Sequence, residues 1–153
     1  MQYWLLKSEP ETFSIDDLAA TPNKTTCWDG VRNYQVRNFM RDAMKPGDLG
    51  FFYHSSCAIP GITGIVKITC NAYSDHTQFD RKHAHYDADS DPQSPRWLMM
   101  DVKLQRKLKR IITLDELRQH QKQLPELLIL KRGNRLSVTP LTEHEWKYIL
   151  TLE

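Results

Sequence analysis

The chain has 153 residues, of which 40% are hydrophobic and 26% are charged. This length and balance predict one globular domain over residues 1–153, with a core that needs no disulfide or metal ion to hold it. Lys and Arg number 21 against 19 Asp and Glu, for a net charge of +2. That charge excludes a histone-like polycation, so any nucleic-acid contact is expected to be local.

The cysteines and the chain start indicate the cellular compartment. Cys27, Cys57 and Cys70 are odd in number and widely spaced, which favours free thiols in a reducing environment. No signal-peptide pattern is present, and no stretch approaches the roughly 18 apolar residues of a membrane-spanning helix. We therefore expect a protein that is not secreted, has no membrane partner, and is cytoplasmic, or nuclear in a eukaryote.

The first third of the chain predicts one strand and two helices. Tyr3 to Leu6 is an aromatic and aliphatic run that predicts a short buried strand ending in a polar turn. A capping-box pattern at Ser14 predicts a short helix that ends near Thr21. Asn33 is expected to cap a second helix over residues 34–44, whose apolar residues recur at helical spacing.

The middle of the chain predicts antiparallel strands around a long loop. The aromatic segment 49–54 is expected to pair with the β-branched segment 62–69, in which Gly64 predicts a bulge or sharp bend. Periodicity is lost over residues 72–95, a polar loop that is either functional or disordered. Alternation resumes over residues 97–108, which predicts a half-buried strand.

The last part of the chain predicts two more helices. Capping boxes at Thr113 and Thr142 predict one helix that runs to about Lys122 and another over residues 146–150. Residues 127–130 and 136–138 are expected to form short strands or extended segments. The element order does not alternate regularly, so it favours an α+β fold, a small antiparallel β-barrel with peripheral helices, over a doubly wound sheet.

Several candidate chemistries have weak sequence support. His83 and His85, with Asp80 or Asp87, could form a metal site, but solvated side chains are the better interpretation because the pattern specifies no converging geometry. We expect neither a metal nor a cofactor. The basic run over residues 103–110 is interpreted as a solvated sheet edge, with contact to a nucleic-acid backbone as the alternative.

Polar and aromatic residues gather at predicted strand and helix ends. They occur in four segments, namely Lys7-Ser8-Glu9, Trp28 to Tyr34, Tyr53-His54-Ser55 and Arg135-Leu136-Ser137. Each segment alone is compatible with a structural role. Together they supply aromatic faces, hydroxyls, an amide and both signs of charge, which suit a site that stacks on a planar base and bonds to its edge.

These segments resemble the EVE domain family of the PUA-like superfamily. The resemblance is carried in order by Tyr3 to Pro10, Trp28 to Asn38, Lys45-Pro46-Gly47-Asp48, Phe52 to Ser55, Gly61 to Gly64, Gln78-Phe79-Asp80, Tyr86-Asp87, Trp97, Arg135 to Val138, Pro140 and Trp146. It spans essentially the whole chain and implies a PUA-like β-barrel with peripheral helices. It also implies a non-enzymatic reader of a modified base, either C5-modified cytosine in DNA or a modified base in RNA.

The resemblance transfers the family's pocket onto particular residues of this chain. They are Lys7, Ser8, Glu9, Trp28, Arg32, Asn33, Tyr34, His54, Ser55 and Ser137. As a hypothesis, one base leaves the helix and stacks on Trp28, with Tyr34 or Tyr53 as a second aromatic. Arg32, Arg37 and Arg135 are expected to contact the flanking phosphates.

An enzyme is the alternative function. The related ASCH domains include small amidohydrolases that act on modified cytidines with a Lys, a Thr and a Glu. Lys7 and Glu9 could supply two of these groups in a closed pocket. The sequence offers no clear candidate for the threonine, so the reader is the preferred interpretation.

Overall fold

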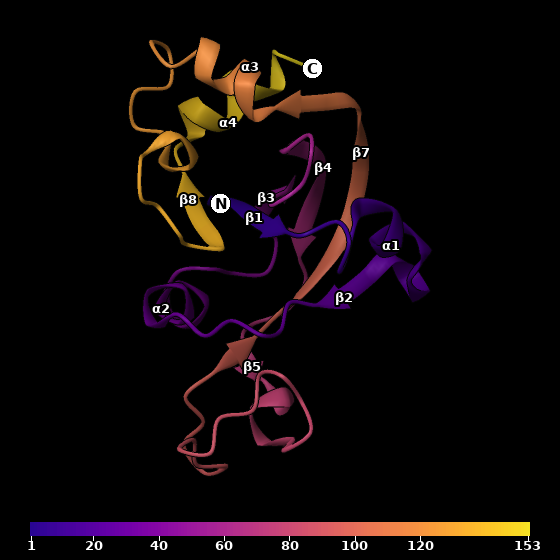
Figure 1. The fold of residues 1–153 in the computed structure, drawn as a ribbon, viewed down its shortest axis with the longest axis vertical. Coiled ribbons are helices and arrows are strands. Elements are labelled where there is room, and N and C mark those ends of the chain that lie inside the picture. The colour runs from indigo at the N-terminus through magenta and orange to yellow at the C-terminus, as the bar shows by residue number, and fades with distance from the viewer.

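The computed structural model describes residues 1–153, and a curled six-stranded sheet in the order β2-β7-β4-β3-β1-β8 forms its centre (Figure 1). The strands of this sheet are β1 (Tyr3–Ser8), β2 (Thr25–Cys27), β3 (Leu49–His54), β4 (Gly61–Ile68), β7 (Asp101–Thr113) and β8 (Val138–Leu141). A second sheet pairs β5 (Tyr73–Ser74) with β6 (Leu98–Met99). The predicted α+β class is confirmed, as a half-barrel with peripheral helices.

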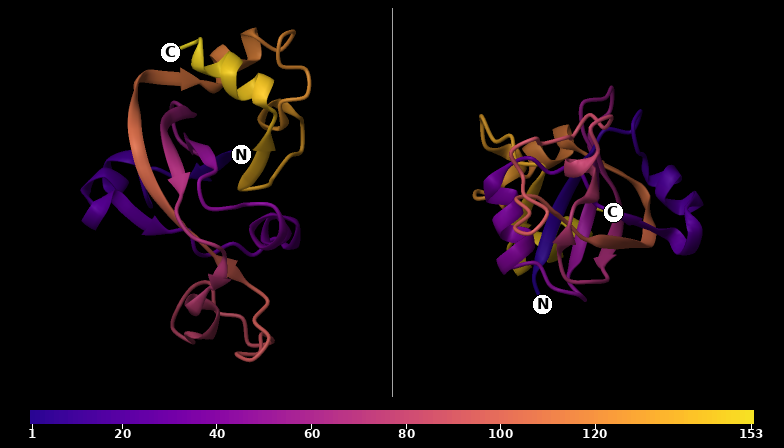
Figure 2. Two further views of the ribbon diagram at one scale, coloured as in Figure 1. Left: turned by 180° about the vertical axis from the view of Figure 1, so that it is seen from behind. Right: turned by 90° about the horizontal axis from the view of Figure 1, so that it is seen from below.

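Four α-helices and three short 3-10 helices surround the sheet. They are α1 (Ile15–Ala20), α2 (Tyr34–Asp42), α3 (Leu114–Gln119), α4 (Glu143–Leu150), η1 (Pro22–Lys24), η2 (His76–Phe79) and η3 (Leu128–Leu130). Figure 2 shows α3 and α4 at one end of β7, whereas the loop between β5 and β6 projects from the other end. None of the helices has the length and apolar character that crossing a membrane requires.

Strand β1 forms the one parallel pair of the sheet, with β3. It pairs parallel with β3, Leu5 lying opposite Phe51, and antiparallel with β8 on its other side. The remaining pairs are antiparallel. A parallel pair requires a long crossover, and the segment from residue 9 to 48, which contains α1, β2 and α2, supplies it.

Two hydrophobic clusters cover the two faces of β1. Trp4 and Leu6 belong to the cluster that contains the buried residues of α1 and α2. Leu5 belongs to the cluster that contains Leu117 of α3 and Trp146 of α4. All three β1 side chains are at most 1% exposed, so the strand is held from both sides and its last residues emerge from the core in one orientation.

The expected irregularity at Gly64 is confirmed. The pairing of β4 with β7 shifts register between Ile62 and Gly64. A Cβ atom at Gly64 would lie 2.7 Å from the Cδ1 of Ile15 and 3.0 Å from the carbonyl oxygen of Arg106. Glycine is therefore needed where the bent sheet approaches α1.

Three local predictions were incomplete or wrong. Strand β2 was not predicted, because three residues are too few to show alternation. Residues 128–130 form a 3-10 helix rather than a strand, since a short apolar run does not distinguish the two by periodicity. The polar loop over residues 72–95 contains β5 and η2, and the single strand predicted over residues 97–108 is divided into β6 and β7, which extends to Thr113.

Asp48 provides a test of how β1 is fixed to the sheet. This buried carboxylate accepts hydrogen bonds from the Gln2 N–H, the Trp4 indole N–H and the Lys45 N–H, at 3.0–3.1 Å. Asp48→Ala is expected to lower the free energy of unfolding by about 3 kcal/mol, because buried donors lose a charged acceptor. Urea denaturation measures this loss. The exposed control Asp42→Ala should change it by less than about 0.5 kcal/mol, and an equal loss in the two variants would contradict this role.

Candidate functional site

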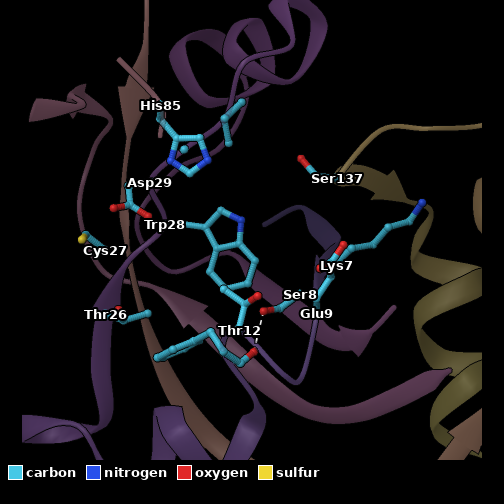
Figure 3. Close-up of a pocket in the computed structure, with 13 residues that line it drawn as sticks. Lys7, Ser8, Glu9, Thr12, Thr26, Cys27, Trp28, Asp29, His85 and Ser137 are labelled. Atoms are coloured by element: carbon cyan, nitrogen blue, oxygen red, sulfur yellow. Dashed lines mark hydrogen bonds between the residues drawn. The ribbon is translucent and has the colours of Figure 1, made fainter. Parts of the chain in front are cut away.

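A cavity of about 550 Å³ opens at the carboxyl end of β1 (Figure 3). Four parts of the chain line it: the end of β1 with the turn that follows, β2 with the segment after it, the β5–β6 loop and the residue before β8. The lining residues are Lys7, Ser8, Glu9, Thr12, Phe13, Thr26, Cys27, Trp28, Asp29, Gly30, Val31, His85 and Ser137.

Backbone pairing brings the predicted polar segments together at this end of β1. The Lys7 N–H donates to the Ser137 carbonyl at 2.8 Å, and the Ser55 N–H donates to the Ser8 carbonyl at 3.0 Å. The Ser8 hydroxyl donates to the Phe13 carbonyl at 2.5 Å. Because its hydrogen is used in this bond, the Ser8 hydroxyl can only accept a hydrogen bond from a ligand.

Trp28 supplies the aromatic face of the cavity. Its backbone N–H donates to the Met100 carbonyl at 2.7 Å, which joins the segment after β2 to the residue before β7. The edge of its ring meets Phe52 with centroids 5.7 Å apart and planes at 90°. Figure 3 shows the indole among the polar side chains of the cavity, and the residue is 9% exposed. The indole is thus a positioned stacking surface.

The two charged groups from β1 and its turn differ in exposure. Glu9 is exposed, whereas Lys7 is partly buried. Burial lowers the pKa of the Lys7 ammonium. The wall of the cavity therefore includes one acidic and one basic residue, and in Figure 3 the Lys7 side chain extends away from the Trp28 ring.

The β5–β6 loop is ordered by buried polar groups. Gln78 is fully buried, and its side chain amide donates to the Trp97 carbonyl while its oxygen accepts from the Trp97 N–H and the Ser90 hydroxyl. The Asp87 carboxylate accepts from the Trp97 indole at 2.7 Å. These bonds connect the two ends of the loop and give it a defined conformation in the structure.

The structure gives Arg32 a role other than phosphate contact. Its guanidinium donates five hydrogen bonds, to the carbonyls of Val31 and His85, to the Asp75 carboxylate and to the Thr77 hydroxyl, with the His85 carbonyl accepting two. A guanidinium has five N–H donors, so none remains for a phosphate. Arg32 instead connects the segment after Trp28 to the β5–β6 loop.

Asp75 is the acceptor at the centre of this connection. Its fully buried side chain accepts from the Gly30 N–H, Arg32, and the N–H and hydroxyl of Thr77, at 2.6–3.0 Å. Burial acts to raise the pKa of Asp75, but the hydrogen bonds together outweigh burial and hold that pKa below its ordinary value. Asp75 is therefore a charged carboxylate inside the protein.

Five of the predicted base-contacting residues line the cavity, namely Lys7, Ser8, Glu9, Trp28 and Ser137. The other five lie elsewhere. Tyr53 is 2% exposed within the cluster beneath α3 and α4, on the other face of the sheet from Trp28. Asn33 caps α2 through the Val36 N–H. Ser55 contributes its backbone bond to Ser8 but does not line the cavity.

Tyr34 and Arg37 pack against the β5–β6 loop rather than the cavity. The Tyr34 ring lies 4.8 Å from that of Trp97, and the Arg37 guanidinium lies 4.9 Å from the Tyr34 ring. Arg37 also donates to the carbonyl of Arg96. Arg135, by contrast, is exposed in a shallow basic depression that it forms with Gln35, Arg132 and their neighbours.

The metal hypothesis receives no support from the geometry. No group of three or more His, Cys, Asp and Glu side chains is arranged to hold a metal ion. The His83 ring accepts a hydrogen bond from the His85 N–H at 3.0 Å, and Asp87 bonds to Trp97.

Sequence reasoning missed several lining residues. Asp29, Gly30 and Val31 lie within a segment that was singled out, but their individual roles were not. Thr12, Phe13, Thr26 and Cys27 gave no signal. His85 was noted only as a possible metal ligand, because a loop organised by buried amide and carboxylate groups has no hydrophobic periodicity that could predict which side chain points inward.

The fold and site define a PUA-like α+β half-barrel with a mixed aromatic and polar cavity at the end of its central strand. More narrowly, the chain belongs to the EVE domain family, whose sequence pattern matches residues 2–152.

The relatives include thymocyte nuclear protein 1 of Gallus gallus, which is 50% identical over 99% of this chain and 68% of its own length. The human thymocyte nuclear protein 1 is 48% identical over 99% of this chain and 73% of its own length. A crystal structure of the human THYN1 protein in complex with DNA that contains 5-methylcytosine has a TM-score of 0.95. It is 47% identical and covers 99% of this chain and 97% of that one. A protein from Pseudomonas putida has a TM-score of 0.92 at 46% identity and covers 98% of both chains.

His54 gives the region beside the cavity a pH dependence. Its Nε2 accepts from the Ile15 N–H at the start of α1, at 3.1 Å, and burial lowers its pKa below the ordinary 6.5. Because the pKa of His54 is lower in the folded protein, the unfolded chain takes up a proton at a higher pH than the folded one. The contribution of His54 to stability is therefore complete above about pH 6.5. It decreases as the pH falls from there and is lost once the pH has passed the lowered pKa.

The test compares the protein with His54→Gln, which can accept a hydrogen bond but cannot be protonated in this range. Urea denaturation at about pH 8 and about pH 5 should show the original protein losing more stability than the variant. Equal losses in the two proteins would show that His54 does not carry this dependence.

Proposed function

We propose that this protein is a non-enzymatic reader that binds DNA and holds a C5-modified cytosine, with 5-methylcytosine as the first candidate, in the cavity at the end of β1. The observation that carries the proposal is the positioned Trp28 face in a cavity whose wall includes Ser8 and Glu9 as hydrogen-bond acceptors. The close likeness to a relative whose crystal structure contains 5-methylcytosine DNA supports the same ligand. Binding to DNA would place this activity in the nucleus of a eukaryotic cell, or in the cytoplasm of a bacterium.

The cavity requires the base to leave the double helix. Extrusion of a base costs a few kcal/mol, and stacking on an aromatic side chain returns roughly 1–3 kcal/mol. These terms nearly balance, so stacking on Trp28 allows binding without choosing among bases. Selection must come from the groups that meet the edge of the base.

The polar groups favour cytosine over thymine. The Ser8 hydroxyl can only accept, and the Glu9 carboxylate is also an acceptor when ionised. Cytosine presents its N4 amino group as a donor, whereas thymine presents the O4 acceptor at the same position. A thymine would place an oxygen against these acceptors, so the two bases are distinguished although each can carry a methyl group at C5.

The structure supplies a further residue for the hydrolase alternative, but the side chains are not arranged for catalysis. Thr12 lines the cavity together with Lys7 and Glu9, and so provides the threonine that the sequence did not locate. In Figure 3, however, the Lys7 side chain extends away from Thr12. A lysine that activates or supports a reacting group must lie within hydrogen-bond reach of it, so this arrangement favours binding over turnover.

Trp28→Ala tests the stacking surface. The variant is expected to lose at least about tenfold in affinity for an oligonucleotide with one 5-methylcytosine, because the base loses its stacking partner. Trp28→Phe keeps a smaller ring and should retain part of the affinity. Fluorescence anisotropy of labelled DNA measures both, with circular dichroism as the check that each variant is folded.

The matched control is Tyr34→Ala, which removes an exposed aromatic ring outside the cavity. Its affinity should stay within about threefold of the original protein. If the folded Trp28 variants bind as tightly as the original protein, the stacking role is wrong.

Arg135→Ala tests the phosphate contact. Arg135 lies two residues before Ser137, which lines the cavity, and is exposed with Arg132 in the depression. Arg135 forms no ion pair within the protein. The variant should weaken binding to modified and unmodified DNA alike, and should reduce the slope of log affinity against log salt by about 1.

Titrations at several salt concentrations measure this slope. Arg118→Ala is the control, because Arg118 is exposed on α3 and pairs with Asp115. It should leave the slope unchanged. A loss confined to modified DNA would show that Arg135 reads the base rather than the phosphate.

A further inference from the structure

His85 forms a part of the cavity wall that lies away from the acceptors on Ser8 and Glu9. In Figure 3 its imidazole lies beyond the Trp28 indole, beside Asp29. Ser8 and Glu9 lie on the other side of the indole. His85 and Asp29 are both exposed. These two side chains are therefore open to the part of a ligand that lies on their side of the stacking surface.

The backbone of His85 is held in place although the residue is exposed. Its carbonyl accepts from the Nε and Nη2 of Arg32 at 3.0 and 2.7 Å, and its N–H donates to the His83 ring at 3.0 Å. The imidazole packs closely on Gly30, where a Cβ atom would lie 2.6 Å from its Cε1. The φ of Gly30 is +76°, which also favours glycine. The ring is therefore presented at a defined place in the wall.

The shape of a pyrimidine decides which part of the nucleotide faces His85. In cytosine the amine is on C4 and the sugar is on N1, and these two atoms are at opposite corners of the six-membered ring. When the amine of a stacked cytosine faces Ser8 and Glu9, the glycosidic bond therefore points to the opposite side of the indole, where His85 lies. The deoxyribose and its phosphates leave the cavity on that side.

We propose that His85 donates a hydrogen bond to a backbone phosphate next to the extruded cytosine, on its 5′ or its 3′ side. This inference rests on the proposed function. A neutral imidazole has one N–H donor and a protonated one has two, so either form can donate to a phosphate oxygen. The C5 substituent is on the ring atom next to C4, in the half of the ring that faces Ser8 and Glu9. The contact therefore supports binding of modified and unmodified cytosine alike.

The experiment uses duplexes with one 5-methylcytosine in which the phosphate on its 5′ side, or the one on its 3′ side, is replaced by an uncharged methylphosphonate. On the unsubstituted duplex, His85→Ala is expected to weaken binding about tenfold, because a hydrogen bond to a charged group is lost. On one of the two substituted duplexes the original protein should bind more weakly, and His85→Ala should cause less than about a twofold further loss. The ratio of affinities for 5-methylcytosine and cytosine should stay within about twofold of the original ratio.

His76→Ala is the control, because His76 is an exposed histidine of the same loop that does not line the cavity. It should bind every duplex as the original protein does. Three results with folded His85→Ala would overturn the inference: an unchanged affinity, an equal loss on all the duplexes, or a changed ratio between 5-methylcytosine and cytosine. The reader function would survive each of them. It fails only if the original protein does not prefer 5-methylcytosine, and the inference then fails with it.

Asp29→Asn tests the path of the backbone in the opposite direction. The Asp29 carboxylate lines the cavity, is exposed and forms no hydrogen bond or ion pair within the protein. A phosphate backbone on this side is repelled by the carboxylate, so the variant should bind modified and unmodified DNA at least about threefold more tightly at low salt. Asp89→Asn is the control, because Asp89 is an exposed carboxylate of the β5–β6 loop outside the cavity wall, and its affinity should not change. An unchanged or weaker affinity of Asp29→Asn would show that the backbone leaves the cavity elsewhere.

Discussion

The ion pair between the buried Asp75 and the partly exposed Arg32 is the contact on which the shape of the cavity depends. A buried carboxylate is costly unless it is paired and hydrogen-bonded, and Asp75 meets both conditions through Arg32, Thr77 and the Gly30 N–H. The same pair joins the segment after Trp28 to the loop that carries His85. Removal of Arg32 would leave a buried carboxylate without its cation, and removal of either partner would break the connection between two walls of the site.

The sheet provides the third wall through the position of β1. Residues 4–6 are enclosed by hydrophobic clusters on both faces, so the strand cannot shift register without exposing apolar side chains. Where the apolar residues end, Lys7 and Ser8 emerge between β3 and β8. The change from apolar to polar residues along one strand thus places the donor and acceptor groups, and the rigid core keeps them there.

The sequence predicts the framework better than the site. The apolar runs and capping boxes predict β1, β3, β4 and the four α-helices, because these elements bury regular patterns. Arg32 was interpreted as a phosphate contact, since sequence does not reveal that all five of its donors are used within the protein. Tyr53 was placed with its neighbours in sequence, although alternation along β3 sends it to the opposite face from Phe52. The place of His85 in the cavity wall depends on long-range bonds by Gln78 and Asp75, which no local pattern encodes.

The most direct measurement of the central claim is a crystal structure of this protein with duplex DNA that contains one 5-methylcytosine. The account predicts that the modified base lies outside the helix and stacks on Trp28, with its amino group toward Ser8 and Glu9. A 5-methylcytosine that stays paired in the duplex, or that occupies a different part of the protein, would contradict it.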